Sequence, residues 1–225
     1  NILANYIAMT TAAATRADYR AAVKAGEQGL KAREQMASMG GIFTSTKLER
    51  GYPWWPGEVA QYRELIPFTE GPLGKLILKT PLEWAFRRDT DDCGVDNGFA
   101  TQAVDLTWWN SHKDNLTPDN RRMYPDQWEI IRTNVFVQAQ GIRAPDRLCY
   151  SGTLWYRTEI ELTAEETAGE LHIRFPGIFN VSYVYINGQE IAQRSNYNPL
   201  WFLNDYRFEW DVDTAGGLQI GKNTI

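Results

Sequence analysis

Cysteine and histidine are scarce in this sequence, and their scarcity bears on disulfides and metal sites. The 225 residues include two cysteines and two histidines. Cys93 and Cys149 form no C-x-x-C pair, and His112 and His172 are isolated along the chain, so we expect no zinc site. The two cysteines could pair as one disulfide or remain two buried thiols, and the sequence favours neither.

Several functional classes also lack their sequence signals. No block of lysines and arginines stands out and the net charge is -5, so we expect no nucleic-acid partner. No apolar run approaches the roughly 18 residues that a membrane-spanning helix needs, so we expect no membrane partner. The sequence has neither a G-x-S-x-G motif nor a glycine-rich phosphate loop after a strand.

Residues 1–41 are expected to form two helices. Ile2, Tyr6 and Met9 share one helical face, and Thr15 with Asp18 fits a capping box that begins the second helix. The opening residues lack the basic and apolar regions of a signal peptide. Because the sequence starts inside a predicted helix and stops where a strand should begin, we expect a piece of a longer protein.

Residues 42–81 are rich in proline and glycine. Proline fixes φ and removes a backbone donor, so we expect no long regular element here. Five aromatic side chains argue against a free linker: Tyr52, Trp54, Trp55, Tyr62 and Phe68. We interpret the stretch as an ordered wrapping segment with a short helix over Glu58 to Ile66.

The stretch from Gly152 to Gly188 predicts antiparallel strands. Apolar and polar residues alternate with a period of two over residues 153–162 and 171–175, as in half-buried strands. A third run, residues 181–186, leads into Asn187-Gly188, a dipeptide that favours a tight hairpin turn. Residues 189–193 should therefore return as the next strand. Short strands at this spacing are typical of a β-sandwich.

These residues also carry a family resemblance. Trp155-Tyr156-Arg157 opens a strand, a later strand ends in Ile186-Asn187-Gly188, and an aromatic loop precedes the late Gly221-Lys222-Asn223-Thr224-Ile225. The pattern resembles the jelly-roll sugar-binding domain of glycoside hydrolase family 2 and related galactose-binding-like modules, over roughly residues 82–225. In that family the domain accompanies a catalytic barrel, which carries the catalytic carboxylates. The resemblance therefore implies a neighbouring catalytic domain, a secreted or periplasmic protein and no catalytic residue in this chain.

The resemblance places the first strand of the β domain at Pro81 to Asp89. Further strands are predicted over residues 134–140 and 207–212. The preceding helices resemble the helical region that follows the barrel in large glycosidase-like proteins related to α-glucuronidases. The expected organisation is a helical segment at 1–41, a wrapping segment at 42–81 and a β-sandwich at 82–225.

Candidate sugar contacts are aromatic side chains next to amides and carboxylates. Sugar C–H faces lie flat on exposed aromatic rings, and sugar hydroxyls need planar polar partners. The loop from Asn196 to Asp205 has this composition, and the tryptophan pairs at 54–55 and 108–109 add further rings. The candidate ligand-binding residues are Tyr197, Asn198, Trp201, Asp205, Trp54 and Trp108. For the aromatic residues, the alternative is that the ring is buried and closes the hydrophobic core.

Two polar features have mainly structural interpretations. Asp89, Asp91, Asp92 and Asp96 could hold a structural calcium ion, although the spacing is not that of an EF-hand and an acidic turn explains it as well. Arg157 should form an ion pair or a stack with Glu159 or Trp155. We expect no other cofactor.

The sequence predicts a mainly β protein, an antiparallel jelly-roll β-sandwich with an N-terminal helical segment. Its expected role is a non-catalytic carbohydrate-binding or buttressing module of a glycoside hydrolase. Two alternatives stay open. The sandwich could be purely structural and dock on a catalytic barrel, or it could lend loop residues to a glycosidase active site.

Overall fold

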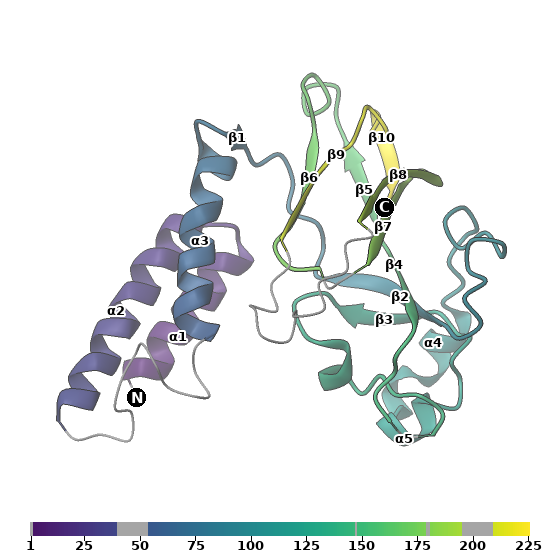
Figure 1. The fold of residues 1–225 in the computed structure, drawn as a ribbon, viewed down its shortest axis with the longest axis horizontal. Coiled ribbons are helices and arrows are strands. Elements are labelled where there is room, and N and C mark those ends of the chain that lie inside the picture. The colour runs from purple at the N-terminus through teal and green to yellow at the C-terminus, as the bar shows by residue number, and fades with distance from the viewer. Residues whose placement is uncertain (1, 40–53, 147, 179–180, 195–208) are drawn as a thin grey trace. The chain divides into compact units, whose positions relative to one another are not determined.

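The computed structural model describes residues 2–39, 54–146, 148–178, 181–194 and 209–225 (Figure 1). These residues divide into two compact units, Asn1–Lys79 and Thr80–Ile225. The first unit is helical and the second is built from antiparallel strands and short helices. The expectation of a mainly β chain is therefore only partly correct, because helices make up a large share of the described residues. Among these residues, no helix is both long and apolar enough to cross a membrane.

In the first unit, α2 (Tyr19–Ser38) packs against both α1 (Ile2–Thr15) and α3 (Trp54–Glu70), and the short strand β1 (Gly74–Lys75) follows. Small residues let the helix backbones approach closely: Ala13, Ala14 and Ala22 form the core. The N-cap of α2 is Asp18, whose side chain accepts a hydrogen bond from Ala21 N. The prediction that Thr15 begins this helix was wrong, since Thr15 is the last residue of α1.

The helix α3 is longer than the predicted Glu58 to Ile66. Pro56 lies in its first turn, where the missing N–H has no intrahelical partner in any case. Pro67 lies in its last turn, and the chain leaves the helix at Glu70. The prolines therefore mark the two ends of the helix and do not interrupt its middle.

The second unit begins with β2 (Glu83–Asp89), the central strand of a three-stranded antiparallel sheet in the order β3-β2-β4. Three further strand pairs follow, all antiparallel: β5 with β10, β6 with β9 and β7 with β8. Their bounds are β3 Glu129–Arg132, β4 Thr153–Arg157, β5 Glu159–Leu162, β6 His172–Phe175, β7 Ser182–Ile186, β8 Gln189–Arg194, β9 Trp210–Asp213 and β10 Gly221–Thr224.

Short helices connect these strands. They are α4 (Thr107–His112), the 3-10 helix η1 (Lys113–Asn115), α5 (Pro118–Arg121) and the 3-10 helix η2 (Val137–Gln140). The strand predicted at residues 134–140 was wrong, because η2 occupies its second half. The side chain of Gln140 bonds the backbone of Arg132 and Val135, which closes this segment into a compact turn.

The predicted hairpin is confirmed. β7 and β8 pair around Asn187-Gly188, whose φ angles are 52° and 83°, the left-handed values that such a turn requires. The predicted strand over residues 153–162 is divided in two, because β4 pairs with β2 whereas β5 pairs with β10. Within β5 the alternation holds, with Ile160 and Leu162 buried and Glu159 and Glu161 exposed.

Three apolar clusters hold the second unit together. Trp84, Ile160, Leu162 and Ile225 form one, and Phe86, Ile131 and Ile142 form another. The third contains Val184, Ile186 and Val212. Trp84 and Phe86 lie two residues apart on β2 and belong to different clusters, so this central strand contributes to two of them.

Candidate functional site

Most of the predicted sugar contacts lie outside the described residues. Tyr197, Asn198, Trp201 and Asp205 fall in the stretch 195–208, outside the residues that the structure describes. Trp54 begins α3, but its side chain is also outside the description. Trp108, on α4, is therefore the predicted contact whose surroundings the structure describes.

The helix α4 is held by local polar contacts at both ends. Asp105 accepts a hydrogen bond at 2.9 Å from the backbone N–H of Thr107, the first residue of α4. At the other end, the Nδ1 atom of His112 lies 2.8 Å from the carbonyl oxygen of Trp108. A carbonyl can only accept, so Nδ1 carries the proton, and Nε2 of the neutral ring is left as an acceptor.

Two further rings, those of His112 and Tyr124, lie against Trp108. The His112 ring stacks on the indole with centroids 5.0 Å apart and planes at 16°. The Tyr124 ring lies 5.1 Å from the indole, and the His112 and Tyr124 rings are 6.5 Å apart. We call Trp108, His112 and Tyr124 the Trp108 platform.

The Trp108 platform is open to solvent. Tyr124 is 45% exposed and His112 is also exposed, whereas Trp108 is half-buried. The indole therefore supports the other two rings, and the accessible ring surface belongs mainly to His112 and Tyr124. This arrangement combines flat apolar surface with a hydroxyl and an imidazole nitrogen at its edges.

A buried ionic network fixes the segment that carries Tyr124. Arg88 on β2 donates to the carbonyl oxygens of Arg121 at 3.0 Å and Tyr124 at 3.1 Å, and to Glu129 Oε1 at 2.8 Å. Arg121 in turn donates to Glu129, and its guanidinium lies 5.5 Å from the Trp109 ring centre. The Arg88 and Glu129 side chains are fully buried, so the network joins the backbone at Tyr124 to the three-stranded sheet.

The aspartates considered for calcium have structural contacts. The buried Asp89 carboxylate accepts hydrogen bonds from Cys93 N, Gly94 N and the indole nitrogen of Trp155. A Cβ on Gly94 would lie 2.2 Å from that indole nitrogen, so only glycine fits there. Asp92 accepts from Thr153 at 2.7 Å. Two of the four carboxylates thus hold a turn against β4.

Arg157 is bound differently from the prediction. Its guanidinium donates to the carbonyl oxygens of Phe99 and Gln102, and so holds the loop before α4. Burial lowers the pKa of Arg157, and the Glu159 carboxylate partly opposes the shift. The role is structural, as expected, but these hydrogen bonds go to backbone oxygens and not to Glu159 or Trp155.

Cys93 and Cys149 are free thiols. Cys93 is half-buried, and its Sγ atom accepts a hydrogen bond at 2.9 Å from the side-chain amide nitrogen of Asn97. Cys149 is exposed. Of the two possibilities left open by the sequence, the structure therefore shows two separate thiols. The expectation that both would be buried was wrong for Cys149.

His172 is isolated in the sequence but not in space. It pairs with Asp213 across β6 and β9, and its ring nitrogens lie 2.6 Å from Asp211 Oδ1 and 3.2 Å from Glu170 Oε1. The Glu170 and Asp211 carboxylates raise the pKa of His172 above its usual value, because they stabilise the imidazolium. Sequence reasoning missed this group. The sequence does show that the polar residues 170, 172 and 174 alternate with apolar ones and so share one face of a strand. It does not show that this strand pairs with residues 210–213.

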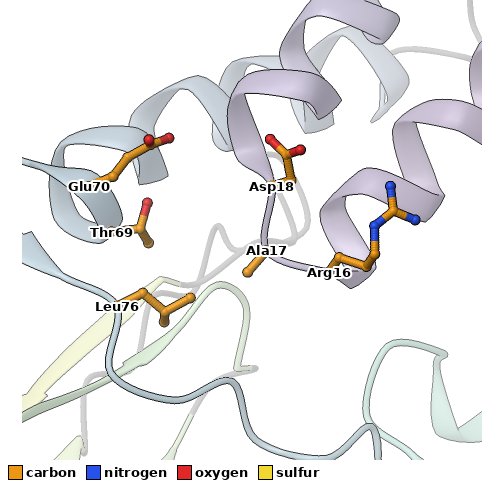
Figure 2. A pocket seen from close by; sticks show the side chains of 6 residues that line it. All are labelled: Arg16, Ala17, Asp18, Thr69, Glu70 and Leu76. Carbon is orange, nitrogen blue, oxygen red and sulfur yellow. The ribbon is translucent and has the colours of Figure 1, made fainter. Parts of the chain in front are cut away.

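A pocket of about 350 Å³ opens in the first unit between the α1–α2 turn and the end of α3 (Figure 2). Several of its lining groups already hold the helices: Asp18 caps α2, Glu70 pairs with Arg20 at 3.0 Å, and Thr69 bonds the Leu65 carbonyl. The remaining lining residues are Arg16, Ala17 and Leu76. We assign the pocket no catalytic role.

No protein-family model matches the sequence, and no curated protein matches it. Among solved structures, the chain is similar to a β-glucuronidase from an uncultured Clostridium species, at 13% identity and a TM-score of 0.44 over 63% of this chain and 20% of that one. It is also similar to the β-glucuronidase from Ruminococcus gnavus in complex with C6-substituted uronic isofagomine, at 21% identity and a TM-score of 0.42 over 63% and 19%. The same enzyme without ligand gives 20% identity and a TM-score of 0.42.

The chain spans about a fifth of the length of these structures. They are β-glucuronidases by name, and at these identities the likeness concerns the course of the backbone alone.

Proposed function

We propose that this chain is a non-catalytic module of a glycoside hydrolase and that it binds carbohydrate on the Trp108 platform. The observation that carries the proposal is the cluster of three rings at the surface, two of them exposed. A sugar presents a patch of C–H groups that packs flat on such rings. Two of the three rings are exposed to solvent, so binding should be weak for one module.

Polar atoms at the ring edges supply the second half of sugar recognition. Because Nδ1 of His112 faces the Trp108 carbonyl, Nε2 is the acceptor that a sugar hydroxyl would meet. The Tyr124 hydroxyl can both donate and accept. The His112 Nε2 acceptor and the Tyr124 hydroxyl, which can donate or accept, suit a neutral ligand that is rich in hydroxyl groups.

Rigid support lowers the entropic cost of binding on this surface. The carbonyl of Tyr124 accepts from the fully buried Arg88, and the His112 ring is held by its own helix. Rings that are fixed before the ligand arrives lose little freedom on binding. The geometry therefore favours a preformed surface over one that closes around the ligand.

The finer expectations from the family resemblance belong to the same proposal. In it, the second unit is a galactose-binding-like jelly roll, the protein is secreted or periplasmic, and a catalytic domain neighbours the module. Tyr197, Asn198, Trp201 and Asp205 remain predicted sugar contacts on a loop, and Trp54 remains one on α3.

The test is a glycan array probed with the wild-type chain and two tyrosine variants. Tyr124→Ala removes an exposed ring of the Trp108 platform, whereas Tyr183→Ala removes a comparably exposed tyrosine, 51% against 45%, from β7. We expect Tyr124→Ala to weaken binding by roughly tenfold, which corresponds to about 1.4 kcal/mol. Tyr183→Ala should bind as the wild type does.

Trp108→Phe provides a milder second variant, because it keeps an aromatic ring under His112. Binding should then fall less than in Tyr124→Ala. If the wild type binds no plant, algal or host glycan, or if Tyr124→Ala and Tyr183→Ala behave alike, the proposal fails.

A structural role without sugar binding is the second candidate. It is favoured by large apolar side chains on the surface of the second unit, among them Phe136 at 66% exposed and Ile220 at 65%. Such residues suit docking on a catalytic barrel. The docking role would be favoured if this chain bound no glycan on the array but formed a complex with the separately produced barrel. The third candidate, loop residues lent to an active site, predicts that the complex is more active than the barrel alone.

A further inference from the structure

We infer that Glu170, His172 and Asp213 form a surface site for a divalent transition-metal ion, with Zn²⁺ as the best fit. One ligand atom from each of the three residues lies within 4.8 Å of the other two. The inference is independent of the proposed sugar binding, because β6 and β9 form their own strand pair.

The strand register brings these side chains together. His172 and Asp213 are partners across the antiparallel pair of β6 and β9, so their side chains leave the same face of the pair. Glu170 stands two residues before His172. Its Oε1 atom lies 3.2 Å from Nε2 of His172. Ligand atoms around a tetrahedral zinc ion at about 2.1 Å lie roughly 3.4 Å apart, so this pair already has the required separation.

A carboxylate outside the proposed ligand set fixes the orientation of the imidazole. The Nδ1 atom of His172 lies 2.6 Å from Asp211 Oδ1, and the second oxygen of Asp211 accepts from Arg174 at 3.2 Å. A zinc-bound histidine usually donates its other ring N–H to a carboxylate in this manner. The contact keeps a proton on Nδ1 and directs Nε2 toward Glu170.

The local charge favours a cation. Four carboxylates belong to this strand pair and the residues that flank it, those of Glu170, Asp211, Asp213 and Glu209, and Arg174 pairs with two of them, Asp211 and Glu209. An ion bound at Nε2 would replace the proton that this nitrogen shares with Glu170, and the proton would leave to solvent. Asp211 would keep its bond to Nδ1.

The donor types indicate which ion fits. One imidazole with two carboxylates suits Zn²⁺, whereas Ca²⁺ and Mg²⁺ prefer oxygen ligands alone. Three protein ligands leave the fourth tetrahedral position to water. All three side chains are exposed, so they can move the short distance needed for closure without disturbing the core.

The test is isothermal titration calorimetry of the tag-free 225-residue chain with Zn²⁺. We expect one ion per chain with micromolar affinity, weakened by roughly tenfold or more in His172→Gln and Asp213→Asn. Both substitutions change exposed side chains, so both variants should fold. His112→Gln removes the other histidine and should leave zinc affinity unchanged.

Three outcomes would overturn the inference. The wild-type chain binds no Zn²⁺ at micromolar concentrations, or His172→Gln binds it as tightly as the wild type, or Ca²⁺ displaces it at equal concentration. A shift of the His172 imidazole signals in the NMR spectrum on zinc addition, absent with Ca²⁺, would support it.

Discussion

At the scale of single residues, Glu129 is the carboxylate at the centre of the buried ionic network of the second unit. Its side chain is fully buried and is shared by Arg88 and Arg121. We predict that Glu129→Gln lowers the free energy of unfolding by about 3–5 kcal/mol, because it leaves two buried guanidiniums without their carboxylate. Urea denaturation followed by circular dichroism measures the change.

The matched control is Glu159→Gln. Glu159 pairs with Lys222 at 2.9 Å, but both side chains are exposed. Its loss should cost less than about 1 kcal/mol. Equal costs for the two substitutions would show that the buried network does not contribute as described.

Tyr62 gives a prediction about alkaline pH. Burial first, then the Glu58 carboxylate and Tyr19, raise the pKa of Tyr62 to about 12. The unfolded chain loses this proton near pH 10, so the contribution of Tyr62 to stability is present below that pH and is lost as the pH rises to about 12. In Tyr62→Phe, the melting temperature should fall less steeply over this range than in the wild type. Parallel curves would contradict the prediction.

At the scale of elements, Gly26 controls the contact between α2 and α3. A Cβ at Gly26 would lie 2.5 Å from Cγ2 of the buried Val59. We predict that Gly26→Ala destabilises the first unit by about 1–3 kcal/mol, because overpacking outweighs the better helix propensity of alanine.

The double variant Gly26→Ala with Val59→Ala separates these two effects. Removing the valine methyl groups makes room for the new Cβ, so the two substitutions should cost less together than the sum of their separate costs. Thermal unfolding of the four proteins measures this coupling. Additive costs would mean that Gly26 does not limit the approach of the helices.

The elements also show what the sequence could predict. Alternation with period two located β5, β6 and β7, and Asn187-Gly188 located the hairpin, because these signals are local. Residues 134–140 alternate too, but the Gln140 side chain closes them into a turn through contacts that no pattern encodes. Proline content misled the prediction for α3, since Pro56 and Pro67 lie at its ends.

The candidate sites were harder to predict than the strands. Trp108 was named for its residue type, but its partners His112 and Tyr124 come from a helix and a loop whose packing depends on the buried Arg88. His172 looked isolated because its partners Asp211 and Asp213 are some forty residues away in sequence. Composition can suggest such residues, whereas only strand register and long-range contacts bring them together.

At the scale of the whole molecule, the helical unit and the strand unit each have their own cores. The second unit presents two separate surface features, the Trp108 platform and the group around His172. We therefore expect zinc and sugar to bind independently. Glycan affinity should be the same with and without Zn²⁺, and a change in either direction would show that the two sites are coupled.

The central claim is that a sugar stacks on the Trp108 platform. Its most direct test follows the indole N–H signals of the nine tryptophans by two-dimensional NMR while pooled soluble plant and algal glycans are added. The Trp108 signal is assigned by its absence in Trp108→Phe. We predict that it shifts progressively with glycan concentration in the wild type and that Tyr124→Ala needs roughly tenfold more glycan for the same shift. A Trp108 signal that does not move in the wild type at millimolar glycan would contradict the account.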